Sequence, residues 1–146
     1  MLTQQEADAL LRELKEIVNP SAFSFPQQNK YGKLALVGKD SNTDFIVDVN
    51  RRGTLRIEKC TFQERVFGNT PLLRLDIDGP EHQNPDGTIL SRNHLHIYRE
   101  GYEVRWAIDI PEEFVDPNDL ITTLINFLEY CKASNYKDLI LQGMVI

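Results

Sequence analysis

Residues 72–107 read LLRLDIDGPEHQNPDGTILSRNHLHIYREGYEVRWA, and this stretch decides the fold. Residues 72–78 and 93–99 both alternate between apolar and polar side chains, which is the pattern of half-buried strands. The NPDG sequence at residues 84–87 is a strong turn signal. The pattern therefore predicts an antiparallel hairpin whose strands are joined by an exposed loop over residues 79–92.

The alternation in this hairpin predicts which side chains share a face of the sheet. We expect an apolar set to face the core: Leu73, Leu75, Ile77, Leu95 and Ile97. We expect a polar set on the opposite face: Arg74, Asp76, Asp78, His94, His96 and Tyr98. Arg105, on the next expected strand, extends this polar face in our prediction.

The same two-residue period covers the chain between about residues 21 and 110. It predicts six short strands, at residues 33–37, 44–49, 54–62, 72–78, 93–99 and 102–109. No helical pattern interrupts them, so we expect consecutive strands to pair as an antiparallel meander.

Helical patterns flank these strands. Thr3 and Glu6 form a capping-box pattern, and the apolar spacing that follows predicts an amphipathic helix over residues 3–18. The DPND sequence at residues 116–119 opens a second helix that ends near Ala133, and residues 137–146 form a last strand or a packed tail. The predicted fold is α+β: one domain over residues 1–146, in which a six-stranded meander lies between an N-terminal and a C-terminal helix.

Composition limits the class of protein. The share of apolar and charged residues is that of a soluble globular domain, and no apolar run approaches the length of a membrane span. The net charge of −6 repels nucleic acid and anionic lipid overall, so contact with nucleic acid must be local. We expect a cytoplasmic protein without membrane contact, and we expect Cys60 and Cys131 to be buried thiols.

All the histidines of the chain, His82, His94 and His96, fall within residues 82–96. Imidazole, phenol and guanidinium groups on one sheet face suit phosphodiester cleavage without a metal or other cofactor. We assign acid–base catalysis to His94 and His96. Tyr98 is the expected auxiliary proton donor, and Asp76 is expected to orient an imidazole. Arg74, Arg105 and His82 are expected to bind the substrate.

Two other interpretations of the histidines stay open. His94 and His96 could bind a metal ion together with Asp76, Asp78 or His82, since H-x-H on a strand directs both rings to one side. The polar side chains could instead form the solvated face of a half-buried sheet, with the histidines bonded to aspartates.

Two motifs carry a resemblance. Arg74–Gly79 with His82 and residues 84–87, followed by the HLHIY-x-EGY run of residues 94–102, resemble an uncharacterised family of small bacterial and phage-associated proteins. Asp76, Pro80 with His82, and His94 with His96 are similar to elements of TumE-type toxins of toxin–antitoxin modules. This second resemblance implies an RNA-directed toxin with an antitoxin partner.

The sequence therefore leads to two functional hypotheses. The first is a metal-independent, RNA-directed nuclease, associated with a prophage or a defence system. The alternative is a non-catalytic acidic binding protein, such as a phage-encoded inhibitor of a host defence or nucleic-acid enzyme. The net charge and four carboxylates near one loop, Asp76, Asp78, Glu81 and Asp86, motivate this alternative. An exposed edge strand would also allow a homodimer.

Overall fold

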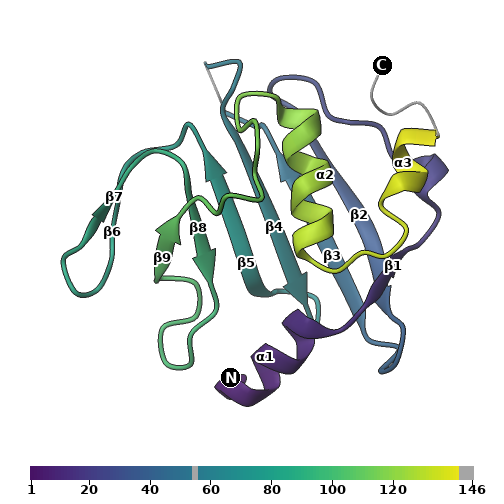
Figure 1. Cartoon of the computed structure of the whole chain (residues 1–146), viewed down its shortest axis with the longest axis horizontal. Helices are drawn as coiled ribbons and strands as arrows, with labels where there is room; N and C mark the ends of the chain where they lie inside the picture. Colours follow the sequence, from purple (N-terminus) through teal and green to yellow (C-terminus); the bar gives the residue numbers. More distant parts are fainter. Residues whose placement is uncertain (54–55, 142–146) are drawn as a thin grey trace.

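The computed structural model describes residues 1–53 and 56–141 (Figure 1). The elements follow one another as α1 (Gln4–Arg12), β1 (Lys15–Ile17), the 3₁₀ turn η1 (Pro20–Ala22), β2 (Tyr31–Gly38), β3 (Asp44–Asn50), β4 (Cys60–Val66), β5 (Thr70–Ile77), β6 (His82–Gln83), β7 (Ile89–Leu90), β8 (His94–Ile97), β9 (Ala107–Asp109), α2 (Leu120–Tyr130) and α3 (Lys137–Leu141). The predicted α+β fold, an antiparallel sheet with helices at both ends of the chain, is confirmed.

The main sheet is antiparallel and follows the order of the chain. Within the described residues it has seven strands, ordered β1-β2-β3-β4-β5-β8-β9. Strands β6 and β7 form a separate small hairpin, which is inserted between β5 and β8. The sheet therefore has one strand more than the predicted meander, because β1 pairs with β2.

The helices cover one face of the sheet, and the core lies between them (Figure 1). Phe127 of α2 meets Phe62 of β4, with 5.9 Å between the ring centroids. Leu75 and Leu128 are fully buried in the same core. Each large apolar side chain removed from water in this way contributes about 1.5–3 kcal/mol. Among the residues described, no helix lies on the opposite face of the sheet.

The first helix is shorter than predicted. It ends at Arg12, because Glu13 turns into an extended conformation and its carboxylate accepts hydrogen bonds from the turn at Ser41. Residues 15–17 then pair with β2, and Lys15 N donates to Lys132 O. Tertiary pairing thus overrides the local helical period.

The strand predicted over residues 54–62 is displaced. Residues 54 and 55 lie outside the described residues, Arg56 to Lys59 form a turn, and β4 runs from Cys60 to Val66. Pairing of β4 with β3 and β5 places Glu64 at a core position, where the pattern leads one to expect an apolar residue. The alternation pattern therefore missed residues 63–66 of β4, because the charged Glu64 stands at a buried position.

Residues 102–109 form a strand only at Ala107–Asp109. Gly101 and Glu103 have φ angles of 85° and 54°, so the chain turns here and cannot continue as a strand. Near the C-terminus, residues 137–141 form α3 where a strand or packed tail was expected, and residues 142–146 lie outside the described part.

The remaining predictions agree with the structure. The strands over 33–37, 44–49, 72–78 and 93–99 correspond to β2, β3, β5 and β8, and Asp119 caps the helix that was expected after residue 119. Cys60 and Cys131 are buried and unpaired thiols. Among the described helices, none combines the length and the apolar character needed to cross a membrane.

Candidate functional site

The sheet face away from the helices presents two rows of polar residues that cross the strands. Strand register aligns the first row as His94, Asp76, Thr61, Asn50 and Tyr31, from β8 to β2. It aligns the second row as His96, Arg74, Gln63, Asp48 and Lys33. As predicted, the four polar residues of the β5–β8 pair share one face. The continuation of the rows onto β3 and β2 was not predicted from the sequence.

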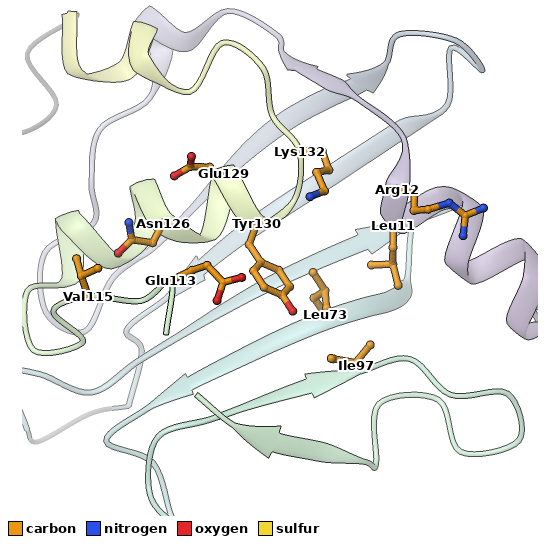
Figure 2. A pocket seen from close by; sticks show the side chains of 10 residues that line it. All are labelled: Leu11, Arg12, Leu73, Ile97, Glu113, Val115, Asn126, Glu129, Tyr130 and Lys132. Atoms are coloured by element: carbon orange, nitrogen blue, oxygen red, sulfur yellow. The ribbon is translucent and has the colours of Figure 1, made fainter. Parts of the chain in front are cut away.

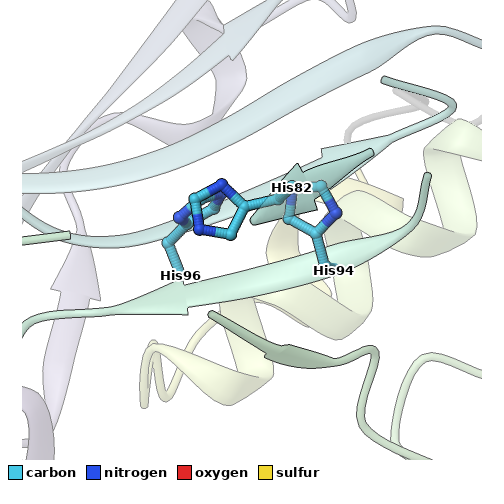
Figure 3. A group of neighbouring side chains, drawn as sticks. All are labelled: His82, His94 and His96. Atoms are coloured by element: carbon cyan, nitrogen blue, oxygen red, sulfur yellow. The ribbon is translucent and has the colours of Figure 1, made fainter. Parts of the chain in front are cut away.

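The third histidine reaches this face through the loop between β5 and β8. Gly87, with a φ of 92°, closes the NPDG turn, and the side chain of Asn84 bonds both the N–H and the C=O of Ala107 at 2.9 Å. This contact fastens the β6–β7 hairpin to the edge strand β9. It places His82 over His94 and His96, with ring centroids 5.4 and 4.5 Å away (Figure 3).

Each histidine ring is oriented by a main-chain carbonyl. His94 Nδ1 lies 2.6 Å from Ser91 O, and His96 Nδ1 lies 2.7 Å from Val104 O. His82 Nε2 lies 2.9 Å from Arg105 O. A carbonyl only accepts hydrogen bonds, so each of these nitrogens carries the N–H. The second nitrogen of each ring is left to face the other rings or Asp76.

Asp76 binds both buried rings. Its Oδ2 lies 3.2 Å from His94 Nε2 and 3.3 Å from His96 Nε2, and its Oδ1 lies 3.2 Å from Arg74 Nε. Burial acts to raise the pKa of Asp76, but the hydrogen bond with His96 and the positive charge of Arg74 outweigh it and hold the pKa below its usual value. The carboxylate is therefore ionised at neutral pH.

Arg74 also lies beside the ring of His96. Its Nη2 lies 3.1 Å from His96 Nε2. The same ring nitrogen lies 3.3 Å from Asp76 Oδ2, so His96 Nε2 stands between a guanidinium group, which only donates, and a carboxylate, which only accepts. Its Nδ1 donates to Val104 O on the other side of the ring.

The three rings are arranged as a possible metal centre. One nitrogen of each of His82, His94 and His96 lies within 4.8 Å of the other two. Tetrahedral zinc bonds of about 2.0–2.1 Å require ligand atoms about 3.3 Å apart, which is the spacing of Asp76 Oδ2 from the two buried rings. The nitrogen atoms of the three histidines would need to approach one another by at most about 1.5 Å to reach this spacing.

Two of the predicted site residues lie elsewhere. Tyr98 was expected on the polar face but is 3% exposed in the core, where its hydroxyl donates to Leu2 O at 2.6 Å. The strand β8 ends at Ile97, and the register shift opposite Glu64 leaves Leu72 as an extra residue in β5. Alternation beyond this point therefore fails to predict the face.

Arg105 contributes its main chain to the site and not its side chain. Its carbonyl holds His82, whereas its exposed guanidinium lies 5.7 Å from the centroid of the Tyr102 ring. Asp78 also leaves the polar row, because its φ of 54° ends the strand, and its carboxylate binds Arg56 and Arg92. These arginines neutralise part of the acidic loop on which the inhibitor hypothesis relied.

A cavity of about 710 Å³ lies on the helical side, between α1, α2 and the edge of the core (Figure 2). Leu73, Ile97 and Tyr130 provide much of its apolar wall. None of the histidines lines it, so this cavity is separate from the polar face.

Comparison with known proteins gives a family without an assigned function. No curated protein and no solved structure matches the chain. Residues 2–133 match a family that is described as a family of unknown function, and this match spans the polar rows, all three histidines and the covering helix. The chain therefore belongs to this family of unknown function, DUF6978.

Proposed function

We propose that the protein binds a divalent transition-metal ion through His82, His94 and His96, with Asp76 as a fourth ligand or as the partner of a bound water. One observation carries the proposal: a main-chain carbonyl fixes one N–H of each ring and directs the other nitrogen inward. Histidines that bind metals almost always donate their second N–H in this way.

The donor set narrows the choice of metal. Three imidazole nitrogens and one carboxylate oxygen suit Zn²⁺, and they also suit Fe²⁺ or Mn²⁺. Three protein nitrogens leave a position for water in a catalytic zinc site. Zinc lowers the pKa of such a water to about 7, which makes hydroxide available as a nucleophile near neutral pH.

The proposed reaction is hydrolysis of a phosphate ester, with RNA as the candidate substrate. Arg74 stands at the edge of the cluster with its side chain 35% exposed, so it can meet an anionic group that approaches the ion. Guanidinium groups stabilise the charge that develops on a transferred phosphoryl group. Arg74 is therefore the proposed phosphate-binding residue.

The metal-independent nuclease remains a second candidate, because both buried imidazoles lie beside the ionised Asp76 and an imidazole is a suitable group for proton transfer. However, His94 and His96 are each 1% exposed and His82 covers them. A ribose hydroxyl could reach these rings only after the β6–β7 hairpin opens. Burial of this kind favours a bound ion over direct attack by the rings on a polymer.

Metal content and cobalt substitution test the proposal. Purified protein should contain about one equivalent of metal, and Co²⁺ added after chelation should give the visible absorption of a tetrahedral site. His82→Ala and His94→Ala should each lose this signal. Glu81→Gln, in the same loop and with an exposed side chain, is the matched control and should keep it.

Cleavage assays then separate the two catalytic candidates. With metal in place, an RNA oligonucleotide should be cleaved, and a chelator should abolish the cleavage. Cleavage by metal-free protein would support the acid–base route in place of the metal route. A protein that takes up neither zinc nor cobalt contradicts the metal proposal.

A further inference from the structure

A groove of about 520 Å³ runs across the polar face and opens beside Asp76. It begins at Gly79 and Pro80 on β5's side, crosses β4, and reaches Asp48 and Tyr31 on β3 and β2. Neighbouring strands lie about 4.8 Å apart, so a path from β5 to β2 measures about 14 Å. The groove is therefore long enough for an extended ligand and ends at the proposed metal site.

The carboxylates of the groove are already neutralised. Asp48 Oδ2 accepts from Arg65 Nε at 2.7 Å, and the Tyr31 hydroxyl donates to the other oxygen. Asp76 is held by Arg74 in the same manner. The negative charges on the floor are thus paired inside the protein and do not repel an anion as isolated carboxylates would.

Lys59 and Gln63 remain available in the groove. Both side chains line it, both are half-buried, and neither has a hydrogen bond or an ion pair with the residues described in 1–53 and 56–141. An ammonium group and an amide without internal partners can bond an anion and a neutral polar group of a ligand.

Tyr31 adds an aromatic ring at the far end. The Arg52 guanidinium lies 4.5 Å from its ring centroid. Proteins that bind single-stranded nucleic acid combine positive grooves, which follow the backbone, with aromatic rings, on which bases stack. Lys59, just before β4, and Gln63, within β4, thus line the groove between Asp76 on β5 and the aromatic ring of Tyr31 on β2.

We infer that this groove binds a single-stranded nucleic acid through its phosphate groups and guides it across the strands to the histidine cluster. The inference rests on the proposed function only for what happens at the end of the groove. Binding itself needs the groove residues and not the metal. A net charge of −6 on the whole chain makes the interaction local and sensitive to salt.

Fluorescence anisotropy with a labelled eight-nucleotide RNA tests this inference on the full chain in the presence of a chelator. Lys59→Gln should weaken binding by about three- to tenfold and reduce the salt dependence by the equivalent of about one phosphate contact. The matched control is Lys39→Gln, which makes the same charge change at the opposite end of β2 from Tyr31. This control should bind like the wild type.

Three outcomes contradict the inference. These are no binding of RNA or of the corresponding single-stranded DNA, equal weakening by Lys59→Gln and Lys39→Gln, and displacement of the oligonucleotide by inorganic phosphate at an equal concentration of phosphate groups. The last outcome would mean that the groove takes free phosphate.

The His94→Ala variant distinguishes the groove inference from the metal proposal. This variant should keep oligonucleotide binding while it loses cobalt. If wild-type protein binds the oligonucleotide but never binds metal, the groove inference stands and the metal proposal fails.

Discussion

The two faces of the sheet each bury a charged cluster, and the clusters are built differently. On the helical face, Lys15 and Glu64 are both 0% exposed and form an ion pair of 3.4 Å. Lys15 also donates to the carbonyls of Glu13 and Cys131, but neither oxygen of Glu64 has a hydrogen bond among the described residues. On the polar face, both oxygens of Asp76 have partners.

This difference indicates a structural role for Lys15 and Glu64, and it supports the proposed ligand-binding role of Asp76. Within residues 1–53 and 56–141, the ion pair of Glu64 is with Lys15 and both side chains are fully buried, which indicates a role in the fold. Asp76 has two histidines and an arginine, and the arginine is partly exposed. A carboxylate with more partners than neutralisation requires, next to a groove, is typical of a site that binds a ligand.

The largest expected effect comes from breaking the pair on the helical face. Lys15→Met leaves Glu64 as a buried carboxylate without its cation, which should lower the free energy of unfolding by about 3–5 kcal/mol. Urea denaturation followed by circular dichroism measures this change. The double variant Lys15→Met, Glu64→Leu should recover most of the stability, since replacement of a buried pair by apolar residues is often neutral. A single variant as stable as the wild type would show that the pair is dispensable.

On the polar face, the corresponding test is the addition of a metal ion and its effect on stability. Zn²⁺ at about 100 times its dissociation constant should stabilise the wild type by about 2.7 kcal/mol. Thermal unfolding with zinc and with a chelator measures this as a shift in Tm. Glu64→Gln should show the same shift, whereas His82→Ala should show none. A zinc-dependent shift that survives loss of His82 would place the ion elsewhere.

A smaller effect is the pH dependence of stability that the buried Glu64 causes on the helical face. Burial raises the pKa of Glu64 to about 7, and the nearby charge of Lys15 opposes this only in part. Because the folded pKa lies above the unfolded one, the contribution of Glu64 to stability is complete below about pH 4.5 and is lost as pH rises through about 7. The stability difference between wild type and Glu64→Gln should fall by about 1–3 kcal/mol between pH 4.5 and 7.5. A difference that is constant with pH would contradict the raised pKa.

The order of the strands could be predicted from the sequence because the period of two in β2, β3, β5 and β8 comes from local alternation. Glu64 and Lys15 could not be recognised as buried, since each side chain looks like a surface charge until its partner is known. His82 was visible as part of a cluster. Its position over His96 depends on the contact of Asn84 with Ala107, which joins segments that are distant in sequence.

The smallest expected effect tests which face Tyr98 serves. In the core, its hydroxyl makes one hydrogen bond, to Leu2 O, so Tyr98→Phe should cost about 0.5–1.5 kcal/mol of stability and leave metal binding and RNA cleavage unchanged. Tyr102→Phe is the control, because its hydroxyl has no hydrogen bond among residues 1–53 and 56–141, and its stability should match the wild type. Loss of cleavage with unchanged stability would instead make Tyr98 the proton donor that the sequence pattern suggested. In that case the hydroxyl would have to leave Leu2 and reach the polar face during the reaction.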